Sequence, residues 1–273
     1  MSISKKERLD QLLIKRGLAP SRERARALIM AGVVTIDGHV IDKAGMLVAD
    51  DALCEVRDSR DELRYASRGG LKLEAALDAF GLNPAGLICL DVGASTGGFT
   101  DVLLQRGARL VYAVDVGQGQ LAWALRHDPR VVVMERTNIR YLGQLPEPAE
   151  CAAIDVSFIS LRLVLPRVAA LTVPDAWIVA LVKPQFEAGK AEADRGAGVI
   201  RDPKVRRRVL LELFDWALAQ SPPLLPQGFT PSPITGREGN REYLLLLGKA
   251  PGKRPVVDKE MIEQALNLEA LQG

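Results

Sequence analysis

Apolar and polar positions change their spacing several times along this chain of 273 residues. Apolar runs of strand length recur through its middle, at 88–92, 110–115, 131–134, 152–158 and 176–184. Most are separated by segments that have the apolar spacing of helices, as in the predicted helix at 161–171. Alternating strands and helices predict an α/β fold with a mostly parallel, doubly wound sheet. The apolar runs at 228–233 and 242–248 flank a polar turn and predict a final antiparallel hairpin on that sheet.

The first 60 residues have shorter elements. Leu9, Leu12 and Leu13 recur at helical spacing, and Ser21 is a favourable N-cap for a second short helix. Residues 33–41, with Asp37 and Gly38 at their centre, predict a hairpin with a type I′ turn, and 52–56 predict another strand. We therefore expect a small α+β domain over 1–60, a polar linker over 61–70, the α/β domain over 71–250 and a C-terminal tail with a short helix over 251–273.

The stretch I-C-L-D-V-G-A-S-T-G-G-F-T, residues 88–100, predicts a strand, a tight turn and the start of a helix. Its glycines permit a close backbone approach, and the first N–H groups of the helix can donate to a ligand. The order of glycines fits the dinucleotide pattern G-x-G-x-x-G poorly, and there is no phosphate-loop G-K-[S/T]. Asp91 would repel a pyrophosphate, but it can accept hydrogen bonds from an amino group. The turn is therefore predicted to bind a small-molecule cofactor.

An acidic residue, Asp115, ends the next apolar run, 22 positions after Gly93. An acid at about this offset binds ribose hydroxyls in doubly wound folds. A ribose together with a cationic amino-acid group describes S-adenosylmethionine. The predicted cofactor contacts are Asp91, Gly93, Ala94, Ser95, Thr96, Gly97, Gly98, Asp115, Asn138 and Asp155. Two simpler explanations stay open: a generic glycine-rich turn with Asp115 as a helix cap, and an asparagine at 138 that only shapes a turn.

Charge, cysteine content and the length of apolar runs limit the kinds of site and partner that the protein can have. The net charge is only +2, so any nucleic-acid surface must be local. The N-terminal 30 residues carry eight Lys and Arg against three Asp and Glu, which suits a phosphate backbone but also an ordinary solvated face. The three cysteines are far apart and predict neither a metal site nor a disulfide. With no apolar run of membrane-spanning length, we expect a cytoplasmic protein with no membrane partner, and we take a monomer as the starting expectation.

Candidate catalytic groups lie where predicted strands end. Lys183 closes a buried apolar run, where an unpaired ammonium would be costly, and Asp155 falls near the end of the preceding run. Lys72 and Glu242 are further candidates by their predicted positions. His39 and His127 are expected at the surface, and no His/Cys cluster competes.

Two sets of motifs resemble a known family. The pattern R-L-D-x-L-L-x-x-R-G-L-A-x-S-R-x-x-A-x-x-L-I-x-x-G-x-V-x-I-D-G, from Arg8 to Gly38, resembles the S4-type RNA-binding domain. The stretches S-R-G-G-x-K-L, D-V-G-A-S-T-G-G-F-T, E-R-T-N, D-V-S-F-I-S, L-V-K-P-Q-F-E and G-N-R-E-Y resemble FtsJ-like ribose 2′-O-methyltransferases, which have a Rossmann-like class I fold. Together they resemble the TlyA family of ribosomal RNA cytidine-2′-O-methyltransferases over nearly the whole chain.

The resemblance implies a Lys-Asp-Lys-Glu tetrad at Lys72, Asp155, Lys183 and Glu242, with S-adenosylmethionine as the methyl donor. Glu238 lies in the same turn as Glu242 but fits the motif less well. We expect Lys183 to act as general base on the ribose of 16S or 23S rRNA, or of both, within ribosomal subunits. The predicted RNA contacts are Arg8, Lys15, Arg16, Ser21, Arg22, Arg24, Arg64 and Arg68.

Other functions remain possible at this stage. A binding-only ribosome assembly factor would share the fold, but the intact cofactor turn and tetrad argue against it. Members of this family have also been called haemolysins, yet no segment has the length and apolar character of a pore former. Methylation of a base is disfavoured because there is no N-P-P-Y-like motif or catalytic cysteine.

Overall fold

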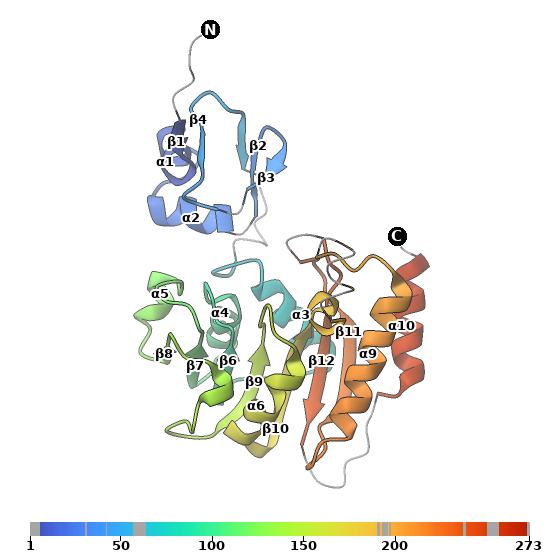
Figure 1. Cartoon of the computed structure of the whole chain (residues 1–273). Coiled ribbons are helices and arrows are strands. Elements are labelled where there is room, and N and C mark those ends of the chain that lie inside the picture. Colours follow the sequence, from blue (N-terminus) through green and yellow to red (C-terminus); the bar gives the residue numbers. More distant parts are fainter. Residues whose placement is uncertain are drawn as a thin grey trace. The chain divides into compact units, whose positions relative to one another are not determined.

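The structure is a computed structural model, and it describes residues 6–30, 32–41, 43–56, 64–189, 192, 196, 198–236, 239–249 and 257–271. The chain divides into two compact units, Met1–Gly70 and Leu71–Gly273. Figure 1 shows the elements of each unit, which are described separately below. The predicted linker overlaps residues 57–63, which lie outside the described part of the chain.

Unit 1 packs two short helices against short strands (Figure 1). Its elements are β1 (Lys6–Arg8), α1 (Leu9–Lys15), α2 (Arg22–Met30), β2 (Val34–Ile36), β3 (His39–Val40), β4 (Leu47–Ala49) and β5 (Cys54–Val56). The predicted hairpin forms as β2 and β3, and positive φ angles of 49° at Asp37 and 81° at Gly38 match a type I′ turn. The antiparallel pair of β1 and β4 was not predicted. Leu9, Leu12 and Leu13 are fully buried in the core, as the helical spacing indicated.

Unit 2 contains the predicted sheet. Its strands are β6 (Ile88–Val92), β7 (Leu110–Val114), β8 (Val131–Met134), β9 (Ala149–Ile154), β10 (Thr172–Val182), β11 (Leu225–Pro231) and β12 (Tyr243–Gly248). They are ordered β11-β12-β10-β9-β6-β7-β8. The pairs from β10 to β8 are parallel, and β12 pairs antiparallel with both β10 and β11. The predicted doubly wound sheet with a C-terminal antiparallel hairpin is therefore confirmed.

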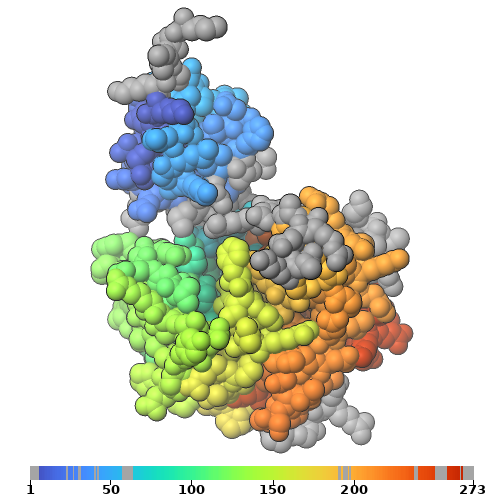
Figure 2. Space-filling view, viewed as in Figure 1, coloured from blue at the N-terminus to red at the C-terminus, as the bar shows by residue number. Residues whose placement is uncertain are grey.

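Helices cover the sheet of unit 2. They are α3 (Gly70–Phe80), α4 (Gly98–Gln105), α5 (Trp123–Arg126), α6 (Leu165–Leu171), α7 (Pro184–Glu187), α9 (Pro203–Leu218) and α10 (Lys259–Leu271), with 3-10 turns η1 (Ile139–Tyr141) and η2 (Leu161–Leu163). Apolar residues of α6, α9 and α10 share one core with alternate residues of β6, such as Leu90 and Val92. The outer side of α9, in orange, forms part of the visible surface of unit 2 (Figure 2). None of the described helices is both long and apolar enough to cross a membrane.

Several element boundaries differ from the prediction. The strand expected at 152–158 is β9, which begins at Ala149 and ends at Ile154, so Asp155 lies just beyond the sheet. The helix expected at 161–171 is divided into η2 and α6. Pro166 lies in the first turn of α6, where a proline is well tolerated. In each case the apolar pattern located the element, while local backbone chemistry determined where it ends.

Candidate active site

The turn between β6 and α4 has the backbone geometry that its glycines permit. Gly93 and Gly97 have φ angles of 86° and 97°, in the region that side chains other than glycine rarely adopt. The N–H groups of Gly93 and Ala94 both donate to the carbonyl of Val114, at 2.8 and 3.1 Å, which ties the turn to β7. A Cβ atom on Gly93 would lie 2.3 Å from the carbonyl oxygen of Asp155. Only glycine therefore fits between the turn and the segment that carries Asp155.

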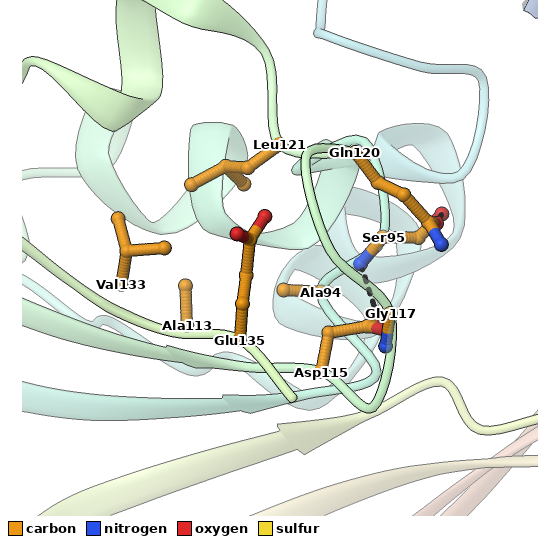
Figure 3. A pocket seen from close by; sticks show the side chains of 9 residues that line it. All are labelled: Ala94, Ser95, Ala113, Asp115, Gly117, Gln120, Leu121, Val133 and Glu135. Carbon is orange, nitrogen blue, oxygen red and sulfur yellow. Dashed lines mark hydrogen bonds between the residues drawn. The ribbon is translucent and has the colours of Figure 1, made fainter. Parts of the chain in front are cut away.

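A pocket lies beside this turn, at the ends of β7 and β8 (Figure 3). Its lining combines small or apolar residues with polar ones: Ala94, Ser95, Ala113, Asp115, Gly117, Gln120, Leu121, Val133 and Glu135. Asp115 accepts hydrogen bonds from the backbone N–H groups of Ser95, at 2.7 Å, and Gly117, at 2.6 Å. A carboxylate has about four acceptor positions, so Asp115 retains acceptors for a ligand hydroxyl. The pocket thus offers an apolar wall and an acid, which suits a nucleoside.

Sequence reasoning did not single out two polar residues of this pocket, Gln120 and Glu135. Glu135 accepts a hydrogen bond from the backbone of Gly119 at 2.8 Å and forms an ion pair with Arg126. The hydrogen bond from Arg126 holds the pKa of Glu135 below its usual value, so its carboxylate is charged near neutral pH. The E-R-T-N stretch quoted above contains Glu135, but nothing in that pattern showed that its side chain would line the pocket.

Asp91, which pairs across the sheet with the pocket residue Ala113, is fully buried. Its Oδ2 accepts a hydrogen bond of 2.6 Å from the Thr100 hydroxyl, while its Oδ1 has no hydrogen-bond partner in the part of the chain described. Burial raises the pKa of Asp91 to about 7, and the hydrogen bond from Thr100 only partly opposes this effect. A buried acceptor without a partner is costly, so Asp91 fits a role in receiving a donor from a ligand.

The other predicted cofactor residues differ in their surroundings. Gly97 is the N-cap of α4 and Gly98 its first residue, and no side chain caps this helix. The carbonyl of Thr96 accepts a hydrogen bond from Ala122 at 3.2 Å. Asn138 caps η1 by accepting a hydrogen bond of 3.1 Å from the backbone of Arg140, and it is not among the residues that line the pocket. The simpler explanation given above for Asn138, a turn residue, accounts for this geometry.

Two lysine–carboxylate pairs lie at the same edge of the sheet. Lys183, which follows β10, forms an ion pair of 2.6 Å with Asp155, which follows β9. Its ammonium also donates to the hydroxyl of Ser157 at 2.9 Å. The side chain of Lys183 is only 10% exposed, so these partners compensate for the burial of its charge. The structure thus joins two of the predicted tetrad residues directly.

The second pair joins Lys72 of α3 to Glu242, with 2.5 Å between Nζ and Oε2. Both residues are buried, at 7% and 4% exposure. Val182 pairs with Tyr243 across the antiparallel β10 and β12. Lys183, which follows Val182, and Glu242, which precedes Tyr243, therefore lie at the same end of the sheet. The alternative residue Glu238 lies outside the described residues.

The two loops that follow β9 and β10 are joined by further contacts. The ring centroids of Phe158 and Phe186 are 5.1 Å apart. Glu187 accepts hydrogen bonds from the Ser160 hydroxyl, at 2.6 Å, and from the N–H of Leu161, at 2.7 Å. Sequence reasoning quoted these residues within motifs but gave them no role. Phe158 is 91% exposed with a φ angle of 63°, an unusual state for a large apolar side chain beside buried charges.

The predicted RNA contacts of unit 1 separate into distinct groups. The guanidinium of Arg16 donates to the carbonyls of Ala52 and Asp50, both at 2.5 Å, which gives it a structural role. Ser21 caps α2 by accepting a hydrogen bond from the N–H of Arg24 at 3.1 Å.

The remaining predicted RNA contacts keep a charged group at or near the surface. Lys15 is exposed and pairs with Glu7 at 2.9 Å. Arg8 and Arg22 both pair with Asp10. Arg24 is exposed, Arg68 is half-buried, and the guanidinium of Arg64 lies 5.1 Å from the centre of the Tyr65 ring.

Comparisons with known proteins agree with this architecture. Residues 65–249 match the FtsJ-like methyltransferase family, and residues 7–52 match the S4 domain. A relative from Mycobacterium tuberculosis, named 16S/23S rRNA (cytidine-2′-O)-methyltransferase TlyA, is 49% identical over 90% of this chain and 91% of its own length. A Bacillus subtilis relative with an rRNA methyltransferase name is 51% identical over 89% of this chain and 86% of its own.

A solved structure from Streptococcus thermophilus, which carries a haemolysin name, is also similar. It has 42% identity and a TM-score of 0.71, and the match covers 99% of both chains. The family match covers more than half of the chain, and the relatives align over nearly their full length. The chain therefore belongs to the FtsJ-like methyltransferase family, within the TlyA group that carries an S4 domain before the methyltransferase domain.

Proposed function

We propose that this enzyme transfers a methyl group from S-adenosylmethionine to the ribose 2′-hydroxyl of a cytidine in ribosomal RNA. The observation that carries the proposal is the pair of lysine–carboxylate contacts, Lys183 with Asp155 and Lys72 with Glu242, beside a glycine-rich turn. The name of the M. tuberculosis relative supports the choice of ribosomal RNA and of cytidine. A ribosomal substrate would also agree with a cytoplasmic protein.

The residues around the turn fit S-adenosylmethionine. Asp115 would hold the ribose hydroxyls, and the apolar wall formed by Ala94, Ala113 and Val133 would contact the adenine. Asp91 has a buried oxygen with no hydrogen-bond partner among the described residues, which suits the amino group of the methionine part. When bound, this cofactor would supply an activated methyl group on its sulfonium.

The tetrad would act on the ribose. A 2′-hydroxyl is a weak nucleophile, so its proton must be removed as the oxygen attacks the methyl carbon. We assign this proton to the Nζ atom of Lys183, which lies at the sheet edge next to Asp155 and would act as the neutral amine, after its ammonium has released a proton to solvent. Asp155 and Ser157 would hold the amine in position, and Glu242 would orient Lys72 toward the same region. The carbon–sulfur bond breaks as the carbon–oxygen bond forms, which leaves S-adenosylhomocysteine.

The exposed ring of Phe158 suits RNA that is not fully stacked. Sequence-specific recognition of RNA often stacks an unpaired base on an aromatic side chain. Phe158 follows Ser157, whose hydroxyl contacts Lys183, so a base on this ring would lie beside the proposed general base. We assign Phe158 a role in holding the target nucleotide or its neighbour.

The first test is transfer of labelled methyl from S-adenosylmethionine to purified 30S and 50S ribosomal subunits. Ribose methylation would be located as a position resistant to alkaline hydrolysis. Lys183→Ala is expected to abolish transfer while cofactor binding stays close to that of the wild type. Retained turnover would reject Lys183 as the base. Cofactor binding by the wild type without transfer to either subunit would instead favour the binding-only assembly factor.

A further inference from the structure

One residue of the G-N-R-E-Y stretch, Asn240, has no role in the proposed function, yet it is almost completely buried, at 3% exposure. Its side-chain amide makes hydrogen bonds to residues 40 and 42 positions earlier in the chain. The oxygen Oδ1 accepts from the N–H of Ile200 at 2.9 Å, and the nitrogen Nδ2 donates to the carbonyl of Gly198 at 2.8 Å. Asn240 therefore fastens the segment before α9 to the residues before β12.

The two partners of Asn240 require one acceptor and one donor on the same side chain. An N–H group can only donate and a carbonyl can only accept, so the pattern of partners also fixes which way the amide points. An ionised aspartate would offer no donor, and a leucine of similar size would offer neither group. Because buried backbone groups without partners are costly, hydrogen bonding constrains the residue at this position.

The backbone of Asn240 is linked to the Glu242 carboxylate through Gly236. The carbonyl of Asn240 accepts a hydrogen bond from the N–H of Gly236 at 2.8 Å. A Cβ atom on Gly236 would lie 2.6 Å from Oε1 of Glu242, so the carboxylate packs directly against the glycine. The other oxygen, Oε2, lies 2.5 Å from Nζ of Lys72. One carboxylate oxygen thus faces Gly236 while the other faces the lysine.

Strand pairing alone does not determine where this carboxylate lies. Glu242 precedes β12, and its carbonyl accepts a hydrogen bond from the N–H of Ser232 at 2.9 Å. That bond fixes the backbone, whereas a glutamate side chain keeps several rotatable bonds and loses entropy when it is ordered. The contact with Gly236 restricts these bonds. The position of Gly236 therefore matters for the contact between Glu242 and Lys72.

We propose that Asn240 is a positioning residue for methyl transfer, because it anchors the Gly236 contact to the segment 198–200 and so keeps the Glu242 carboxylate against Lys72. Asn240 touches neither substrate nor cofactor in this arrangement and acts through Glu242. A small displacement of an active-site group can lower a rate strongly even when binding is unchanged. The inference rests on the proposed function, since it extends the tetrad assigned there.

Two variants of the full-length protein separate positioning from a purely structural role. Asn240→Ala removes both hydrogen bonds of the amide. Lys249→Met is the matched control, because Lys249 follows the other end of β12 and donates to the carbonyls of Ala169 and Thr172, both at 2.6 Å. Each variant thus loses two hydrogen bonds from a side chain to the backbone. A purely structural role predicts similar effects on turnover for the two variants.

Methyl transfer to purified 30S and 50S subunits would give kcat and KM, and denaturant unfolding would give stability. We expect both variants to lose stability. Asn240→Ala should also lower kcat by about tenfold or more, with the KM for the subunit and the affinity for S-adenosylmethionine near their wild-type values. Lys249→Met should keep kcat near that of the wild type. An equal loss of kcat in the two variants, or a change in KM or cofactor affinity in place of kcat, would overturn the proposal.

Asn240→Asp provides a test that depends on pH and also serves if Asn240→Ala does not fold. This variant keeps the size of the side chain and the oxygen that accepts from Ile200, but its ionised form cannot donate to Gly198. Burial favours the protonated form of the introduced carboxyl group, which can donate again. The kcat of Asn240→Asp relative to the wild type should therefore rise as the pH is lowered. A ratio that equals one at every pH would overturn the positioning role.

A comparison of stabilities keeps this proposal separate from the proposed function. If Asn240 acts through Glu242, the stability losses of Asn240→Ala and Glu242→Gln should not add in the double variant, because both change the same contact with Lys72. The losses of Asn240→Ala and Lys249→Met should add. Absence of methyl transfer by the wild type would reject the proposed function, whereas the stability cycle would still test the link. Additive losses for Asn240→Ala and Glu242→Gln would overturn it.

Discussion

Replacement of Asp91 by asparagine should change how the stability of the protein depends on pH. The pKa of Asp91 in the folded protein is raised to about 7 by burial. In the unfolded chain an aspartate has a pKa of about 3.9. Below the unfolded pKa the carboxyl group is protonated in both states. As the pH rises toward 7, the unfolded chain releases this proton while the folded protein keeps it. The contribution of Asp91 to stability is therefore present at low pH and lost as the pH rises through about 7.

The size of the effect follows from the difference in pKa. Between about pH 5 and about pH 8, the shift corresponds to a loss of about 3 kcal/mol in the free energy of unfolding. The Asp91→Asn variant cannot lose this proton, so its stability relative to the wild type should improve by about this amount over the same range. Asparagine also leaves a buried polar group without a partner, which lowers stability at every pH and cancels in the comparison.

Denaturant unfolding of wild type and Asp91→Asn at several pH values would measure this difference. Asp175→Asn is a matched control, because Asp175 is an exposed acid on β10 and its replacement should leave the pH profile unchanged. If the difference in the free energy of unfolding between the wild type and Asp91→Asn stays constant from about pH 5 to about pH 8, the reasoning is refuted.

Cofactor binding gives a second readout of the same group. A cationic amino group near Asp91 favours the charged carboxylate, so S-adenosylmethionine should release a proton when it binds near neutral pH. Calorimetry in buffers with different ionisation enthalpies would detect this proton, and the affinity of the wild type should rise as the pH increases from about 6 to about 8. If neither the affinity for S-adenosylmethionine nor the number of protons released on binding depends on pH, Asp91 does not contact the amino group.

Three further predictions concern the turn and the loops. Gly93→Ala should lower the free energy of unfolding by more than the roughly 1–2 kcal/mol of left-handed backbone strain expected for Gly81→Ala. Gly81 (φ 62°) is the control, because a Cβ there would have no described atom within 4 Å. Thermal unfolding should show the larger stability loss for Gly93→Ala, and transfer assays should show lost activity for that variant alone. Phe158→Ala should leave stability within about 0.5 kcal/mol but lower transfer about tenfold, as expected for a stacking contact of about 1–3 kcal/mol; unchanged transfer would remove Phe158 from the site. Glu187→Ala should cost about 1–3 kcal/mol by leaving the N–H of Leu161 without its acceptor, and it should lower kcat more than the affinity for S-adenosylmethionine. Equal stability in chemical denaturation would contradict this role.

Local patterns predicted the parts of the fold that depend on local chemistry. Asp37-Gly38 specified its hairpin turn, because both positions require positive φ angles. The β6–α4 turn could be predicted equally well, because its glycines directly follow an apolar run of strand length. The antiparallel pairing of β1 with β4 was not predicted, because strands of three residues separated by two helices and two other strands leave no periodic signal.

The sequence pattern could not predict contacts between residues that are far apart in the chain. The sequence placed Lys183 and Asp155 at one sheet edge, but their contact depends on the adjacency of β9 and β10. Arg16 counted as an RNA contact because of its charge, whereas its donors bind backbone carbonyls 34 and 36 positions away. The exposure of Phe158 was likewise unpredictable, since an apolar residue after a strand is ordinarily expected to be buried.

The sheet order explains how the proposed cofactor turn and the proposed tetrad come to lie at one edge of the sheet. The chain proceeds from β6 outward to β7 and β8, then returns to the other side of β6 for β9 and β10. In such sheets, ligands bind where the strand order reverses, outside the carboxyl ends of the strands. Here the reversal lies between β6 and β9, where the N–H of Asp155 donates to Val92 at 2.9 Å and Gly93 contacts the Asp155 carbonyl. The loops after β6 to β8 carry the proposed cofactor contacts, while Asp155, Lys183 and Glu242 of the proposed tetrad lie just outside the ends of β9, β10 and β12. Substitutions in the first group should therefore change cofactor affinity, and those in the second should change turnover.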